Sequence, residues 1–163
     1  MKDIRIVIVD DSAFSIAFIR NILDNNGFEV VGDAGTLEEV KAVVKDKKPT
    51  LVTMDMTWPG TDGLECTRAI HEIDETIKVI VVSSMMDEEI LYEAKKLHIV
   101  GYVQKPVDAD ELIRSIEQVV AVDELFLFLQ DHYFAVFKEA LMDGMNRMTK
   151  SIITYQDEYR CEK

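Results

Sequence analysis

Cysteine and basic residues are both scarce in this sequence, and each shortage narrows what the protein can be. The only two cysteines, Cys66 and Cys161, lie far apart and match no metal-ligand spacing, so we expect neither a disulfide nor a zinc site, and we expect a reducing, cytoplasmic location. The 18 Lys and Arg residues stand against 31 Asp and Glu, and this net charge of −13 disfavours binding to nucleic acid or to anionic membranes. Long apolar runs are lacking too. The run near the N-terminus is broken at once by Asp10 and Asp11, so we expect neither a signal peptide nor a membrane span.

The chain instead alternates short β-branched runs with stretches of helical spacing. Each apolar run is bounded by turn residues and is short enough for a buried strand. Strands alternating with amphipathic helices indicate an α/β fold, in which a parallel sheet is covered on both faces. Right-handed crossovers then favour a doubly wound, five-stranded sheet of flavodoxin-like order. The predicted strands are Ile4–Val9, Glu29–Gly32, Leu51–Asp55, Lys78–Ser83 and Tyr102–Gln104.

Helix-start signals follow several of these strands. A Ser, Thr or Asp in front of a helical pattern predicts an N-cap, and a Glu three residues later adds a capping box. The expected starts are Ser12, Thr36 with Glu39, and Asp108 with Glu111, and two further helices are expected at Leu64–Ile73 and Asp87–Lys96.

Polar residues stand at the ends of four of the predicted strands. In an open α/β sheet, ligands bind just beyond the carboxyl ends of the strands. One such residue could merely cap the following helix, but so many matching strand ends are hard to explain by capping alone. Three carboxylates, a hydroxyl and an ammonium group should therefore meet at one rim of the sheet: Asp10, Asp11, Asp55, Ser83 and Lys105.

The chemistry of this cluster points to phosphoryl transfer. Three packed carboxylates repel one another unless a cation intervenes, and a site that offers only oxygen ligands favours Mg²⁺. One carboxylate can then attack phosphorus, in a reaction that depends on positioning and charge neutralisation. We expect Asp55 to be the nucleophile because it stands alone after a central strand. Asp10 and Asp11 would hold the metal, and Lys105 and Ser83 would contact phosphoryl oxygens.

At this point the sequence resembles a known family. The segments IVIVDDSAFSI, LVTMDMTWPGTDGLE, VIVVSS and GYVQKP, in this order and spacing, are similar to the response-regulator receiver domain of two-component signalling, in particular to chemotaxis regulators. The resemblance covers about residues 3–122. It implies a receiver domain over residues 1–122 and leaves residues 123–163 as a C-terminal extension.

The resemblance also implies a role for each site residue. Asp55 would be the phosphoacceptor, and the backbone carbonyl of Thr57 would join the three carboxylates as a Mg²⁺ ligand. Lys105 matches the lysine of the family motif, and a cis peptide bond would connect it to Pro106. Ser83 matches the switch hydroxyl and Tyr102 the switch aromatic, which turns inward when the domain is phosphorylated.

The extension is harder to interpret. Its apolar residues recur every three or four positions from Phe137 to Tyr159, which predicts one face of a helix. This face could pack on its own receiver, or it could pair with a second copy or with another protein; we favour pairing. With five basic and eight acidic residues, residues 123–163 are too short and too acidic for a DNA-reading domain.

The function implied by the resemblance is that of a response regulator. It would take a phosphoryl group from a sensor histidine kinase or a phosphotransfer protein and then switch protein–protein interactions, without acting as an enzyme on other substrates. One alternative is a metal-dependent phosphohydrolase with an aspartyl nucleophile, but such enzymes typically space two acids as D-x-D, whereas Asp10 and Asp11 are adjacent. The other alternative, a transcription regulator that reads DNA through its extension, is disfavoured by the charge of that segment.

Overall fold

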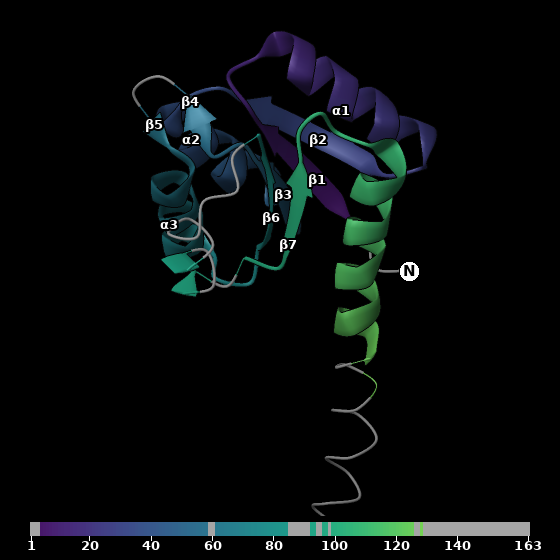
Figure 1. The fold of residues 1–163 in the computed structure, drawn as a ribbon. Helices are drawn as coiled ribbons and strands as arrows, with labels where there is room; N and C mark the ends of the chain where they lie inside the picture. The colour runs from purple at the N-terminus through teal and green to yellow at the C-terminus, as the bar shows by residue number, and fades with distance from the viewer. Residues whose placement is uncertain are drawn as a thin grey trace, which may run out of the picture. The chain divides into compact units, whose positions relative to one another are not determined.

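The first compact unit of the chain is built on a parallel sheet. A computed structural model describes residues 4–58, 61–84, 92–93, 96–97, 99–125 and 128. Contacts divide the chain into two units, Met1–Val119 and Val120–Lys163. The sheet of the first unit has five strands in the order β2-β1-β3-β6-β7, and every neighbouring pair is parallel (Figure 1). This order confirms the predicted doubly wound, flavodoxin-like fold.

The strands lie close to where the apolar runs place them. β2 extends two residues beyond the predicted end at Gly32, because its backbone follows β1 as far as the pair Val9 and Ala34. The five strands are β1 (Arg5–Val9), β2 (Glu29–Ala34), β3 (Leu51–Met54), β6 (Lys78–Ser83) and β7 (Gly101–Gln104).

The helices begin at the predicted capping residues. The side-chain oxygens of Ser12, Thr36 and Asp108 each accept a hydrogen bond from the backbone N–H three residues later, at 3.3, 3.3 and 3.0 Å. The capping box differs in one detail, because the Glu39 carboxylate accepts from the N–H of Gly35. The helices are α1 (Ala13–Asn25), α2 (Leu37–Lys47), α3 (Gly63–Ile73) and residues 109–125, while most of the predicted helix Asp87–Lys96 lies outside the described residues.

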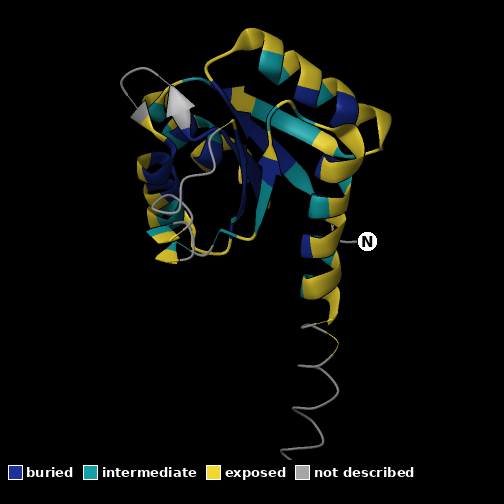
Figure 2. Cartoon of the chain, in the orientation of Figure 1, coloured by how far each residue is buried: buried dark blue, intermediate teal, exposed yellow. Residues whose placement is uncertain are grey.

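The sheet is buried on both faces. Helices α2 and α3 lie on one side of it and α1 on the other (Figure 1). One set of alternating strand residues, which includes Val7, Val52 and Val81, packs with α2 and α3 into one hydrophobic cluster. The central strands β1, β3 and β6 are dark with burial in Figure 2, whereas the edge strand β2 is mostly intermediate and the helices carry exposed outer faces. Such two-sided burial explains why the strands read as nearly continuous apolar runs.

The turn after β3 contains a structure that the sequence analysis missed. Two short strands, β4 (Thr57–Trp58) and β5 (Thr61–Asp62), pair antiparallel where only a turn was expected. The side chain of Asp62 then accepts the N–H of Leu64 at 2.9 Å and caps α3. This hairpin joins the end of the central strand directly to the third helix.

The second unit is described only over residues 120–125 and 128, which are helical. Three large apolar side chains of this stretch, Val122, Leu125 and Phe128, are more than half exposed. The helical face predicted from Phe137 onward lies outside the described residues, and the boundary at residue 122 stays a prediction. In the part of the chain that the structure describes, no helix combines the length and the apolar character that a membrane crossing requires.

A substitution of Gly63 tests how tightly the chain is packed after the end of β3. A Cβ added at this position would lie 2.5 Å from the backbone oxygen of Asp55 and 2.8 Å from Cα of Met56. We expect Gly63→Ala to lower the free energy of unfolding in urea by about 1–3 kcal/mol, because backbone must shift to accept the methyl group.

The matched control is Gly35→Ala, whose new Cβ would meet its nearest atom, the backbone oxygen of Asp10, at 3.4 Å. This contact is ordinary, so we expect a change of less than about 0.5 kcal/mol. Equal stabilities of the two variants would show that the backbone at Asp55 and Met56 can accommodate the added methyl group, which would contradict the expected tight packing.

Candidate functional site

The sheet ladder continues one residue past β1 and β3, and this fixes two of the predicted carboxylates. The N–H of Asp10 donates to the carbonyl of Ala34 at 3.0 Å, and the N–H of Asp55 donates to the carbonyl of Val9 at 2.9 Å. Both residues therefore leave the sheet at defined positions on the same rim.

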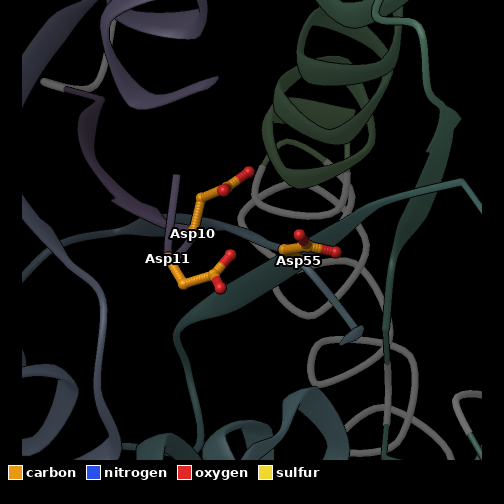
Figure 3. Close-up of side chains that lie close together, drawn as sticks. All are labelled: Asp10, Asp11 and Asp55. Carbon is orange, nitrogen blue, oxygen red and sulfur yellow. The ribbon is translucent and has the colours of Figure 1, made fainter. Parts of the chain in front are cut away.

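Asp10, Asp11 and Asp55 form one cluster, as predicted. Their carboxylates each offer an oxygen, and these oxygens lie within 4.8 Å of one another (Figure 3). Asp10 and Asp55 are buried, at 1% and 5% exposure, whereas Asp11 is exposed. The cluster is thus open to solvent on the side of Asp11 and enclosed at its base.

Lys105 supplies the positive charge of the site. Its Nζ donates to Oδ2 of Asp10 at 2.8 Å and to Oδ2 of Asp55 at 2.7 Å. Burial by itself lowers the pKa of this ammonium group, but the hydrogen bonds and charges of the two carboxylates outweigh it and raise the pKa above its ordinary value. Lys105 is therefore fully charged at neutral pH. The bond from Lys105 to Pro106 is cis, as the resemblance implied.

The backbone of Ser83 connects Lys105 to Tyr102. The carbonyl of Ser83 accepts the N–H of Lys105 at 2.9 Å and the hydroxyl of Tyr102 at 3.1 Å. Burial, with a contribution from Glu111, raises the pKa of Tyr102, so its hydroxyl keeps the proton that it donates. The structure thus brings the predicted switch residues Ser83 and Tyr102 together beside the predicted lysine.

Thr57 stands two residues after Asp55, as the first residue of β4. Its backbone is therefore close in sequence to Asp55, at the start of the hairpin. Its backbone carbonyl as a metal ligand stays a prediction.

Sequence reasoning missed two donors to Asp10. The N–H of Ser12 donates to its Oδ1 at 2.9 Å, and the hydroxyl of Ser15 donates to its Oδ2 at 2.5 Å. Ser12 was expected only as a helix cap. The available signal was the position of Ser15 in the first turn of α1, because the start of a helix that follows β1 must lie at the rim of the sheet.

The donor set fits a hard divalent cation. Every candidate side-chain ligand is a carboxylate oxygen, and among the described residues two of the three carboxylates are buried with one ammonium group between them. Three carboxylates and one lysine leave an excess of negative charge, which a bound cation would offset. Within the described residues this is the one group of three or more acidic, His or Cys side chains with such geometry.

A doubly wound sheet with three carboxylates and a lysine at its strand ends defines a class of α/β domain whose acidic site lies where open sheets bind their ligands. The family model for the response regulator receiver domain matches residues 6–117, and the chain belongs to this family.

Curated relatives and a solved structure agree with this assignment. Chemotaxis protein CheY of Bacillus subtilis is 35% identical over 116 residues, which cover 71% of this chain and 97% of that protein. Sporulation initiation phosphotransferase F of the same organism is 30% identical over 118 residues, which cover 72% and 94%. The CheX–CheY–BeF3–Mg²⁺ complex from Borrelia burgdorferi is similar with a TM-score of 0.68 and 27% identity, covering 72% of this chain and 89% of that chain.

The comparisons establish the general function. The chain carries the receiver domain of a two-component response regulator, and neither the phosphohydrolase nor the transcription-regulator alternative is favoured. Receiver domains bind Mg²⁺ through an acidic cluster of the kind formed by Asp10, Asp11 and Asp55.

The double ion pair of Lys105 generates a prediction on stability. Without this ammonium group, two buried carboxylates would face each other with no cation between them. We expect Lys105→Ala to lower the free energy of unfolding by about 3 kcal/mol, and added Mg²⁺ to restore part of the loss. Because the folded pKa of Lys105 is raised above its ordinary 10.5, the difference from wild type should be constant near neutral pH and should shrink only as the pH rises above that value.

Chemical denaturation across this pH range, with and without Mg²⁺, measures both effects. Lys41→Ala serves as the control, because Lys41 belongs to an exposed pair with Glu38 at 3.8 Å and its loss should cost less than about 1 kcal/mol. Equal losses for the two lysines would contradict the proposed importance of the buried pair.

Proposed function

We propose that Asp55 is the residue that accepts the phosphoryl group, from a phosphohistidine of a sensor kinase or a phosphotransfer protein. A carboxylate oxygen of Asp55 forms a bond to phosphorus while the nitrogen–phosphorus bond breaks, and the leaving imidazole keeps the electron pair. The observation that carries the proposal is the position of Asp55, buried at the end of a central strand with its Oδ2 2.7 Å from Nζ of Lys105. An adjacent cation and ammonium group are what such a transfer needs.

Mg²⁺ is proposed to be held by Asp10, Asp11, Asp55 and the backbone carbonyl of Thr57. Support comes from the three carboxylates, whose oxygens lie within 4.8 Å of one another. The group contains no His or Cys, and Mg²⁺ prefers oxygen ligands. When bound, the ion neutralises charge on the phosphoryl oxygens. The described geometry leaves the exposed Asp11 as the side of the cluster from which a cation would enter.

Lys105 and Ser83 are proposed to bind the phosphoryl oxygens. The ammonium group of Lys105 already donates to the carboxylate of Asp55, so a short movement would bring it to an oxygen of a phosphoryl group on that residue. Ser83 ends β6, the strand next to β3 in the sheet, which supports a role for its hydroxyl as a second donor.

The output is proposed to be a change in protein–protein contacts around Tyr102. The carbonyl of Ser83 accepts hydrogen bonds from both the hydroxyl of Tyr102 and the backbone N–H of Lys105. A displacement of Lys105 would therefore disturb the hydrogen bond between Tyr102 and Ser83. The B. burgdorferi relative is seen with a protein partner together with BeF3 and Mg²⁺. In this chain an open hollow lies beside the tyrosine, lined by Val100, Gly101, Tyr102, Asp108, Glu111, Arg114, Ser115 and Gln118.

The domain is proposed to promote only its own phosphorylation and dephosphorylation, without acting as an enzyme on other substrates. A net charge of −13 supports the further proposals that it binds neither nucleic acid nor membrane. The cytoplasmic location stays a prediction.

The extension is proposed to form a homodimer. Leu125 and Phe128 of the extension, together with Val122 directly before it, recur at three-residue intervals and share one side of the helix, and the exposed fractions of Val122, Leu125 and Phe128 are 65%, 57% and 56%. An exposed apolar stripe of this kind, followed by the predicted helical face from Phe137 onward, suits a helix of a second copy of the chain.

The phosphoacceptor is tested by replacing Asp55. We expect Asp55→Asn to abolish labelling by acetyl phosphate in the presence of Mg²⁺, as read from the intact mass, because an amide oxygen is a far weaker nucleophile than a carboxylate. Asp24→Asn is the matched control, since Asp24 is an exposed aspartate of α1, and it should be labelled like the wild type. Labelling of the Asp55 variant at the wild-type rate would overturn the assignment.

The dimer is tested by light-scattering mass with Mg²⁺, with and without beryllofluoride. We expect about twice 18.6 kDa for the full chain and a monomer for residues 1–122. In the full chain, Leu125→Glu should restore the monomer because it buries a charge in the seam, whereas Glu124→Gln should leave the dimer intact. A monomeric full chain in both conditions would exclude this role for the extension.

A further inference from the structure

Ser15 links the start of α1 to the acidic cluster. It is the third residue of the helix and is partly buried. Its backbone N–H donates to Oγ of Ser12 at 3.3 Å, while its own hydroxyl donates to Oδ2 of Asp10 at 2.5 Å. The side chain therefore points from the helix into the site and ties the cap of α1 to a buried carboxylate.

The hydrogen bonds of Asp10 define which of its oxygens can face a cation. Each carboxylate oxygen can accept about two hydrogen bonds or ligand bonds. Oδ2 accepts from both Ser15 and Lys105, whereas Oδ1 accepts the N–H of Ser12. Among the contacts of the described residues, Oδ2 is thus filled and Oδ1 keeps one free position. The carboxylate is held from three sides, so its rotation is restricted.

Ser15 differs from Lys105 in one essential respect. In the proposed reaction the ammonium group of Lys105 moves toward the phosphoryl group on Asp55, and its hydrogen bond to Asp10 is then weakened or lost. The hydroxyl of Ser15 donates to Asp10 and not to Asp55 in the described part of the chain, so it has no reason to move with the phosphoryl group. It is therefore the side-chain donor that can hold Asp10 while the lysine is engaged.

We propose that Ser15 is a positioning residue that orients Asp10 for Mg²⁺ binding by holding Oδ2, so that Oδ1 faces the cation. The inference rests on the proposed Mg²⁺ site. Its physical basis is that hydrogen bonds to a ligating carboxylate fix its orientation before the metal arrives, and the removal of such a partner typically weakens metal affinity by about 10–100-fold.

A purely structural role makes a different prediction. If the hydroxyl of Ser15 only stabilises the folded chain, its removal lowers stability and leaves the Mg²⁺ affinity of the folded protein unchanged. Affinity and stability must therefore be measured on the same variants.

The experiment is calorimetric titration of the full chain with MgCl₂, accompanied by urea unfolding. We expect Ser15→Ala to raise the Kd for Mg²⁺ by about tenfold. Ser15→Thr keeps the hydroxyl and should bind like the wild type, and Ser15→Cys, which has a weaker donor, should lie between the two. The Cys variant also serves as the test if the Ala variant does not fold.

Two controls separate the outcomes. Thr50→Ala removes the side-chain oxygen that accepts the N–H of Arg5 at 3.0 Å. This bond lies at the amino ends of β1 and β3, opposite the site, so its loss should lower stability without changing the Kd. Asp11→Asn should abolish or strongly weaken binding; if it does not, the proposed Mg²⁺ site is wrong, and the role of Ser15 fails with it. If Asp11→Asn weakens binding while Ser15→Ala and Ser15→Cys bind like the wild type, only the role of Ser15 is overturned.

Discussion

The structure of the site depends on one interaction, the bridge from the ammonium group of Lys105 to Asp10 and Asp55. The three residues come from the ends of three different strands, at sequence separations of 50 and 95 residues. Two buried carboxylates at one rim would repel each other strongly, since charges in such surroundings are poorly screened. The lysine makes the arrangement tolerable without a metal, and the remaining negative charge keeps the site attractive to one. The same group thus offsets the repulsion between the two buried carboxylates and leaves the site with a net negative charge.

Much of this arrangement could be predicted from the sequence, because the end of each apolar run marks both the end of a strand and a position at the rim of the sheet. Apolar runs that are buried on both faces define the strands, and the residue after each run must lie at the rim. Asp10, Asp55 and Lys105 could therefore be predicted to meet, although the sequence gives no distance between them. Ser12, Thr36 and Asp108 could be predicted as helix caps, because a cap depends only on neighbours within three residues.

The features that the sequence did not reveal depend on contacts with no periodic signal. The pairing of β4 with β5 involves two residues on each side, which is too short for an alternating pattern. The contact of Ser15 with Asp10 joins a helix to a strand end, and a serine in a first helical turn has several ordinary partners. The two-residue extension of β2 is set by its neighbour β1 and not by its own composition. In each case the tertiary surroundings decide, so local sequence alone was insufficient.

The carbonyl of Ser83 is the point at which the chemistry of the site meets the surface. It accepts the backbone N–H of Lys105, whose side chain neutralises the carboxylates, and also the hydroxyl of Tyr102, which borders the open hollow. One acceptor shared by two donors makes their positions interdependent, because a shift of either donor changes the geometry available to the other. If Asp55 takes up a phosphoryl group, as proposed above, the added charge lies beside the ammonium group of Lys105, which is 2.7 Å from Oδ2 of that carboxylate. The hydrogen bonds of the carbonyl of Ser83 then connect the backbone of Lys105 to the hydroxyl of Tyr102, which borders the open hollow.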